Sequence, residues 1–169
     1  CLFNNIANSG YGGAIYCESA LYMLVESSSF FSCKGGYVGG AIFFQNYTNT
    51  HCVLHGVCGN DCCLTNKASS SSQFAYIYVR HEVTYKNYVN YSSIAGCVNE
   101  YSDAKYTLNL CNGKIRCQSV NISMNKCYFQ SGICCWPSFQ SSNVTGSVSY
   151  SSFADNNATG YNCILFASN

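Results

Sequence analysis

Short runs of alternating hydrophobic and polar residues recur along the chain, with the two-residue period of β-strands. Tyr76 to Val79 and Ser147 to Tyr150 are two clear examples. Successive side chains of a strand point to opposite faces of a sheet, so these runs predict short strands with one buried face. No segment shows the i, i+3, i+4, i+7 stripe of an amphipathic helix. The pattern therefore predicts an all-β chain.

The N-terminal part of the sequence repeats itself after 27 residues, from Gly12 to Gly39. Residues 3–15 read FNNIANSGYGGAI, and residues 30–42 read FFSCKGGYVGGAI. Weaker copies follow, and the successive units are marked by Val25, Val53, Val89, Val120 and Val148. Near the C-terminal end, Gly160 to Phe166 falls at the position of the GGAI segment. Units of this length indicate a solenoid, in which each repeat packs only on its neighbours.

A unit of about 30 residues without a helix fits one coil of a parallel β-helix. We predict a right-handed parallel β-helix of about six coils, stapled by disulfide bonds, in a single domain over residues 1–169. Val25, Phe30 and Ile42 are predicted to point inward and to stack on equivalent positions of neighbouring coils. Gly12-Gly13 and Gly39-Gly40 are predicted at corners, where a positive φ or a close approach of two coils excludes a Cβ atom. A β-sandwich or a propeller fragment is the alternative, since both also contain short strands.

The repeat resembles those of known surface proteins. The residues that carry the likeness are Phe3-Asn4-Asn5, Gly12-Gly13-Ala14-Ile15, Phe30-Phe31-Ser32-Cys33, Gly39-Gly40-Ala41-Ile42, His55 to Cys62 and Gln73 to Tyr76. They are similar to the repeats of chlamydial polymorphic outer-membrane proteins and of the cysteine-rich β-helical surface proteins of trichomonad protists. The GGAI motif is absent after residue 42. The resemblance implies a right-handed coil, surface exposure and an adhesive or structural role, with no cofactor and no catalytic residue.

The composition points to an oxidising compartment. Charged residues make up only 9% of the chain and the formal net charge is +1, so no electrostatic footprint for nucleic acid or an anionic membrane is visible. Fourteen cysteines are present, an even number without a CxxC spacing, which favours disulfide bonds over metal binding. We expect essentially all of them to be oxidised, with a connectivity that the sequence does not determine. The candidates are Cys1, Cys17, Cys33, Cys52, Cys58, Cys62, Cys63, Cys97, Cys111, Cys117, Cys127, Cys134, Cys135 and Cys163.

Five N-x-S/T sequons are candidate N-glycosylation sites, at Asn46, Asn90, Asn121, Asn143 and Asn157. Asn90 and Asn121 each follow a unit-marking Val and lie 31 residues apart. If Val points inward, strand alternation turns the next residue outward. We therefore predict that these two sequons share one outer face.

Other candidate sites are weaker. His51 to Cys63 contains two His and four Cys, which on a helix could bind zinc. The region reads as strand and loop, however, and favours a disulfide-stapled turn, in which Cys58 pairs with Cys62 or with a cysteine of the next coil. In the adjacent pairs Cys62-Cys63 and Cys134-Cys135, one member is predicted to point inward and the other outward, and a vicinal disulfide is the alternative. Glu100 and Asp103 are the only close carboxylate pair, and no acid cluster recurs at coil spacing. We predict no catalytic residue, no metal and no cofactor.

Two features favour contact surfaces. Residues 68–72 read as an excursion loop in the longest unit, where a β-helix can place a binding function, and a disordered surface loop is the alternative. Tyrosines gather in one third of the chain, at Tyr76, Tyr78, Tyr85, Tyr88, Tyr91 and Tyr101. They are predicted to form stacked ladders, and protein or sugar contact is the alternative role.

These observations together predict a secreted structural or adhesive surface module that is not an enzyme. A carbohydrate-binding or carbohydrate-active β-helix is the second hypothesis, and a metal-dependent or redox protein that uses the thiols is the third. Expected partners are other copies stacked head to tail, or a host or neighbouring cell-surface protein or glycan. No nucleic acid is expected, and no apolar run near 18 residues predicts a membrane span. Neither end carries a polar cap, which predicts either a filament or a piece of a longer β-helix.

Overall fold

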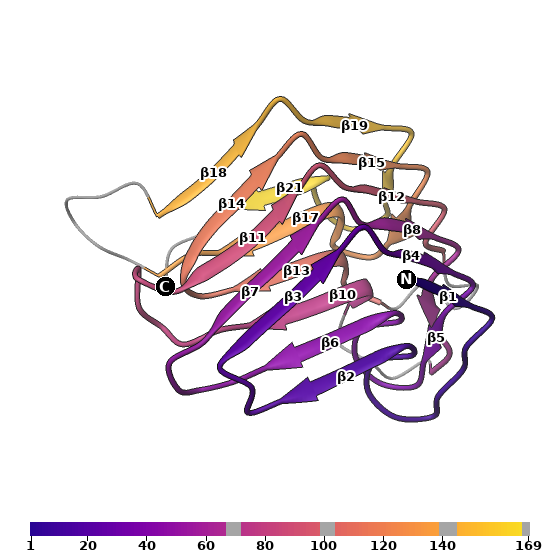
Figure 1. Cartoon of the computed structure of the whole chain (residues 1–169). Coiled ribbons are helices and arrows are strands. Elements are labelled where there is room, and N and C mark those ends of the chain that lie inside the picture. Colours follow the sequence, from indigo (N-terminus) through magenta and orange to yellow (C-terminus); the bar gives the residue numbers. More distant parts are fainter. Residues whose placement is uncertain (67–71, 99–103, 139–144, 167–169) are drawn as a thin grey trace.

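The computed structural model is an all-β solenoid in which the chain winds through three parallel sheets (Figure 1). It describes residues 1–66, 72–98, 104–138 and 145–166. All strand pairs in these ranges are parallel. The same ranges contain no helix, and therefore no helix that could cross a membrane. The predicted all-β parallel solenoid is therefore confirmed.

Each sheet receives one strand from each turn of the chain. Sheet A contains β1 (Leu2–Asn4), β4 (Ser29–Phe31), β8 (Cys58–Asn60), β12 (Ser93–Ala95), β15 (Asn121–Ser123) and β19 (Ser152–Ala154). Sheet B contains β2 (Ile15–Glu18), β6 (Ile42–Gln45), β10 (Ser72–Tyr78), β13 (Tyr106–Cys111), β17 (Gln130–Trp136) and β21 (Ile164–Phe166). Sheet C contains β3 (Tyr22–Glu26), β7 (His51–His55), β11 (Lys86–Asn90), β14 (Lys114–Gln118) and β18 (Gly146–Ser149).

Two short strand pairs complete the coil between sheets A and B. They are β5 (Lys34–Gly35) with β9 (Cys63–Leu64), and β16 (Lys126–Cys127) with β20 (Asn157–Ala158). Sheets A and B have six strands each and sheet C has five. The chain thus makes about five turns, close to the predicted six coils.

The interior is filled by ladders of side chains that occupy equivalent positions of successive turns. Phe3 pairs with Phe30 in sheet A, and their rings stack at a centroid distance of 4.7 Å. Ile15 pairs with Ile42 in sheet B, and Val25 points inward from sheet C. Val25, Phe30 and Ile42 are all buried, which confirms their predicted inward positions. Each ladder residue removes apolar surface from water mainly by contact with the turns above and below it.

The sheet A ladder is interrupted at Gly59, and another strand fills the gap. Gly59 lies between Phe30 and Ile94 in the register of the sheet. Phe74, from β10 of sheet B, enters this space, and a Cβ atom at Gly59 would lie 2.3 Å from its ring. Phe74 also meets Phe30 edge to ring at 6.0 Å. A large side chain from the opposite wall thus replaces the missing one, which keeps the interior closely packed.

At the corners that follow sheets C and A, a single residue adopts the left-handed backbone conformation, with a positive φ. After sheet C they are Ser27, Gly56, Tyr91, Ser119 and Tyr150, and after sheet A they are Asn5, Ser32, Asp61, Gly96, Met124 and Asp155. Their φ angles lie between 45° and 62°. This region costs a residue with a Cβ about 1–2 kcal/mol, and Asn, Asp and Gly tolerate it best. The repeated corner keeps the three sheets in a fixed arrangement from turn to turn.

The paired glycines of the GGAI segments act as predicted. Gly12 and Gly39 have φ angles of 58° and 68°, so the first glycine of each pair supplies the left-handed conformation. A Cβ atom on Gly13 would lie 2.1 Å from the carbonyl oxygen of Gly40, and one on Gly40 would lie 2.0 Å from that of Gln73. The second glycine is therefore required by the close approach of successive coils.

Two of the valines that were predicted to mark the units are out of register. Val25 pairs with Leu54 rather than with Val53, whose side chain points out of the coil. Val120 follows the corner residue Ser119 and does not occupy the ladder of Val89. The inward ladder of sheet C consists of Val25, Leu54, Val89, Cys117 and Val148. The prediction failed because connections of unequal length separate the strands, and Val also occurs at outward and corner positions.

Candidate binding surface on sheet B

Aromatic side chains form a column on the outer face of sheet B, which we call the aromatic column (Tyr16, Phe43 and Tyr76). The three residues are consecutive partners in the sheet register. The rings of Tyr16 and Phe43 stack at 5.4 Å, and those of Phe43 and Tyr76 at 5.5 Å, each with an interplanar angle of 11°. In-register parallel pairing places equivalent side chains about 4.8 Å apart, so flat rings stack along the solenoid axis.

A groove of about 440 Å³ lies along this column. The column ends at Tyr76, because its partner in the next strand is Asn109, which carries no ring. Tyr11 leans over Phe43 at a centroid distance of 5.0 Å. The lining residues are Tyr11, Glu18, Val38, Phe43, Gln45, Tyr76, Lys105, Tyr106 and Asn109. The groove therefore combines aromatic rings with amide, hydroxyl and charged groups.

The polar groups of the groove are neutral hydrogen-bonding groups apart from Glu18 and Lys105. A hydrogen bond to Glu18 raises the pKa of the Tyr16 hydroxyl, and burial raises the pKa of Tyr76 well above its ordinary value. Both hydroxyls are thus protonated at neutral pH and can donate hydrogen bonds. Glu18 is the one carboxylate among the lining residues, so the groove does not bring together the carboxylate pair that glycosidases use.

A second column of outward-pointing side chains lies beside the aromatic column and extends to later turns of the coil. It consists of Glu18, Gln45, Tyr78, Cys111 and Trp136, which are successive partners in sheet B. A second cavity, of about 390 Å³, lies at its far end. The lining residues there are Tyr78, His81, Cys111, Asn112 and Trp136. Aromatic and polar groups therefore continue along most of the length of the outer face of sheet B.

The tyrosine ladders predicted from the sequence are in fact mixed. Tyr76 stacks on Phe43, Tyr78 packs on Tyr47 at 5.0 Å, and Tyr85 and Tyr91 meet His51 and His55 edge to ring at 5.4 and 5.2 Å. The predicted stacking holds for Tyr76, whereas Tyr78 packs at an angle on a tyrosine and Tyr85 and Tyr91 pack at an angle on histidines. The sequence reasoning missed Tyr16 and Phe43. Their signal was present in the repeat, since Tyr16 and Phe43 directly follow the two copies of GGAI.

The cysteines divide between the interior of the coil and its outside. Cys33, Cys52, Cys62, Cys97, Cys117 and Cys135 belong to the buried core, whereas Cys1 and Cys58 are exposed. No disulfide bond is present among the described residues, so the predicted stapling stays a prediction. A bridge between Cys58 and Cys62 does not fit, because Cys58 faces solvent and Cys62 faces the core. The adjacent cysteines Cys134 and Cys135 point to opposite faces, as predicted, with Cys135 in the core.

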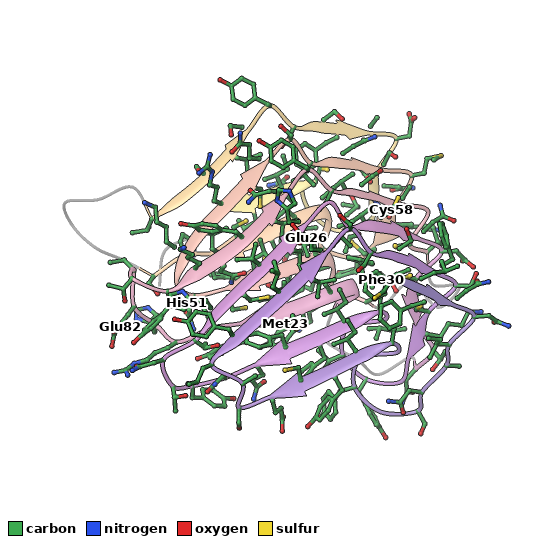
Figure 2. The ribbon with its side chains drawn as sticks, viewed as in Figure 1. Met23, Glu26, Phe30, His51, Cys58 and Glu82 are labelled. Carbon is green, nitrogen blue, oxygen red and sulfur yellow. The ribbon has the colours of Figure 1, made fainter. Side chains whose placement is uncertain are left out.

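The His and Cys side chains of the segment from His51 to Cys63 do not come together in an arrangement that could bind a metal ion. His51, which is labelled in Figure 2, and His55 are on the outer face of strand β7, while Cys52 between them points inward. His51 stacks on Tyr22 at 4.9 Å and accepts the backbone N–H of Lys86 at 3.0 Å. Burial and the charge of Lys86 lower the pKa of His51. Within the described residues, no group of three or more His, Cys, Asp or Glu side chains could hold a metal ion.

The sequons differ in their accessibility. Asn46 is buried: its Nδ2 donates to the carbonyl oxygen of Ala20 at 2.9 Å, and its Oδ1 accepts the backbone N–H of Thr48 at 2.8 Å. Asn121 and Asn157 are exposed. The predicted shared face of Asn90 and Asn121 is wrong, because Asn90 ends β11 of sheet C and Asn121 begins β15 of sheet A. The register error at Val120 produced this prediction.

Several predicted positions lie outside the described residues. They are the sequon at Asn143, the carboxylate pair Glu100 and Asp103, Tyr101, and most of the excursion loop over 68–72, of which Ser72 begins β10. Comparison of the chain with known protein families, with curated proteins and with solved structures finds no match. Its function is therefore inferred from the geometry of its own side chains.

Proposed function

We propose that this chain is an extracellular structural or adhesive surface module, and not an enzyme. The observation that carries the proposal is the aromatic column on sheet B, with the groove beside it. Its rings are held by in-register pairing on a scaffold whose interior is one hydrophobic cluster, so the contact surface is rigid before it meets a partner. Preformed aromatic surfaces with polar neighbours are typical of binding sites.

Two features support the extracellular setting. Fourteen cysteines in 169 residues suit an oxidising compartment, and two exposed sequons, at Asn121 and Asn157, offer sites for glycans. The resemblance to GGAI-repeat surface proteins points the same way. Under this proposal the partner is a neighbouring surface protein or glycan, or another copy of the chain stacked head to tail.

Carbohydrate binding is the second candidate function, and the groove favours it. A sugar presents C–H groups to an aromatic face and hydroxyl groups to amides and hydroxyls. The groove offers Tyr76 at the point where the column ends, next to Asn109 and Tyr106. Its mixture of rings and neutral hydrogen-bonding groups suits a neutral sugar better than a highly charged ligand.

Binding to immobilised glycans and to whole cells tests both candidates. The chain is compared with the double variant Tyr11→Ala, Tyr16→Ala, which removes two half-exposed rings, one from the lining of the groove and one from the aromatic column. Tyr150→Ala is the matched control, because Tyr150 is 88% exposed at a corner outside sheet B. We expect the double variant to lose binding by about tenfold and the control to keep it.

Equal binding by all three proteins would contradict a role of the groove. Turnover of a polysaccharide by the unmodified chain would contradict the proposal that it is not an enzyme. Binding to cells but to no glycan on the array would favour a protein partner over the carbohydrate hypothesis.

A further inference from the structure

Two buried cysteines occupy the same corner position in successive turns. Cys33 and Cys62 each follow the left-handed residue that ends a strand of sheet A, Ser32 and Asp61. The registers on both sides of them, Phe31 with Asn60 and Lys34 with Cys63, place them directly one above the other. Equivalent residues of paired strands lie about 4.8 Å apart, which is within the Cα separation of about 4.4–6.8 Å that a disulfide bond spans.

The thiols of this pair lie next to each other at the buried corner. Neither side chain is exposed to solvent, and the Cys62 thiol is among the groups that shift the pKa of Cys33. The Cys62 thiol also donates to the carbonyl oxygen of Phe30 at 3.4 Å, so it is held at the corner of the preceding turn. The thiol of the next cysteine in the same column, Cys97, donates to the carbonyl oxygen of Ala95 at 3.6 Å. Cys62 is thus held toward the turn of Cys33 rather than toward that of Cys97.

A second thiol pair connects two sheets across the interior. Cys117 points inward from β14 of sheet C, and Cys135 points inward from β17 of sheet B. Both side chains are fully buried in the same hydrophobic cluster, and burial and then the neighbouring Cys117 thiol raise the pKa of Cys135. A bond here would join opposite walls of the coil, whereas a bond between Cys33 and Cys62 would join consecutive turns along one edge.

We propose that Cys33 pairs with Cys62 and that Cys117 pairs with Cys135 in disulfide bonds when the chain folds under oxidising conditions. This inference rests on the proposed extracellular function, since only that setting supplies the oxidant. With oxidised glutathione as oxidant, one thiolate of each pair attacks the glutathione disulfide and releases one glutathione thiol. The second thiolate then displaces the other glutathione, so two S–H groups become one S–S bond and one glutathione disulfide becomes two thiols.

The bonds form before the coil closes. Exchange requires a thiolate and access to the attacked sulfur. In the closed coil both pairs are inaccessible, and burial raises the pKa of Cys62 to about 12, so its thiolate is scarce at neutral pH. A chain folded in the reduced state is therefore expected to oxidise at these pairs only as fast as the coil opens.

The experiment refolds the reduced full chain in a glutathione redox buffer, blocks remaining thiols with N-ethylmaleimide and maps the linked peptides by tandem mass spectrometry without reduction. We expect links between Cys33 and Cys62 and between Cys117 and Cys135. Cys33→Ser should remove only the first link and Cys117→Ser only the second, while Cys58→Ser, at an exposed cysteine, should keep both. Reduction of the oxidised protein should lower its Tm by about 5–10 °C.

A link between Cys62 and Cys97, or full labelling of all four thiols after oxidative refolding, would overturn the inference. Circular dichroism of each variant shows whether it folds, and Cys33→Ala and Cys117→Ala replace any serine variant that does not. The same mapping on protein secreted by eukaryotic cells separates the two proposals. If the pairs form during refolding but the chain is retained in the cell, the extracellular proposal fails and the pairing stands. If the chain is secreted with other links, only the pairing fails.

Discussion

The side-chain oxygen of Asn125 accepts the backbone N–H of Cys97 from the preceding turn at 2.9 Å. Asn125 occupies the corner position that Cys33, Cys62 and Cys97 occupy in earlier turns, and it is buried. Its Nδ2 donates to the carbonyl oxygen of Ile94 at 3.2 Å and to Oδ1 of Asn156 at 3.0 Å. The corner column thus changes from thiols to amides, and the amides satisfy backbone groups of the turn before them.

Replacing Asn125 should be costly for this reason. Asn125→Ala leaves the N–H of Cys97 and the C=O of Ile94 without their side-chain partner, and we expect a loss of about 1–3 kcal/mol in the free energy of unfolding. Asn4→Ala, at an exposed position of β1, is the control and should change the free energy of unfolding by less than about 0.5 kcal/mol. Urea unfolding followed by circular dichroism measures both. Equal midpoints for the two variants would contradict the structural role of Asn125.

The second glycine of the GGAI motif should tolerate no side chain. A Cβ atom on Gly40 would lie 2.0 Å from the carbonyl oxygen of Gln73, so Gly40→Ala forces two coils apart. We expect a loss of at least about 2 kcal/mol, or failure to fold. Gly10→Ala is the control, because its Cβ would be no closer than 3.5 Å to any neighbour and the change should be nearly neutral. The measurement is again urea unfolding, with secreted yield as a second readout.

The left-handed corners allow a test of the conformational cost of a positive φ in the absence of a steric clash. A Cβ atom on Gly96 would meet its nearest neighbour at 3.6 Å, so Gly96→Ala adds only the cost of a φ of 60°. We expect Gly96→Ala to lower the free energy of unfolding by about 1 kcal/mol. Met124 is at the equivalent corner of the next turn with a φ of 56°, and Met124→Gly should act in the opposite direction or have no effect. A stabilising Gly96→Ala would contradict the shared corner geometry.

The fold could be predicted because its strongest constraints are local. Gly39 and Gly40 are required by a positive φ and by a coil contact, so they repeat as a motif with Gly12 and Gly13. The register was harder to predict. Connections of unequal length between strands moved Val53 and Val120 away from the inward ladder, because alternation alone does not reveal how many residues a corner or an excursion contains.

The candidate site was less predictable than the fold. Tyr16, Phe43 and Tyr76 become neighbours only through the sheet register, and their spacing along the chain is irregular because different numbers of residues separate the strands of successive turns. The stacking of Cys62 on Cys33 has the same origin. A sequence shows that such residues are present, but long-range pairing decides which of them meet.

The pH dependence of stability should reveal the redox state of the core. Burial raises the pKa of Cys62, Cys111, Cys127 and Cys134 from 9.0 to about 12. Between pH 9.0 and about 12 these thiols keep their protons in the folded state and release them in the unfolded state. Wherever the folded state binds more protons than the unfolded state, the free energy of unfolding falls as pH rises. The contribution of these thiols is therefore fully present below pH 9 and is lost progressively between pH 9 and about 12.

We accordingly expect the reduced protein to lose stability steeply above pH 9, and the oxidised protein to lose less. A disulfide bond between Cys33 and Cys62 removes two titrating thiols, while the tyrosines titrate equally in both forms and cancel in the comparison. Urea midpoints of both forms, measured in half-unit steps from pH 7 to 10.5, test this. If the two curves keep a constant separation over the whole range, the buried thiols do not contribute as described. A separation that widens above pH 9 supports their burial as neutral groups, and Cys58→Ser, which removes an exposed thiol, should leave that widening unchanged.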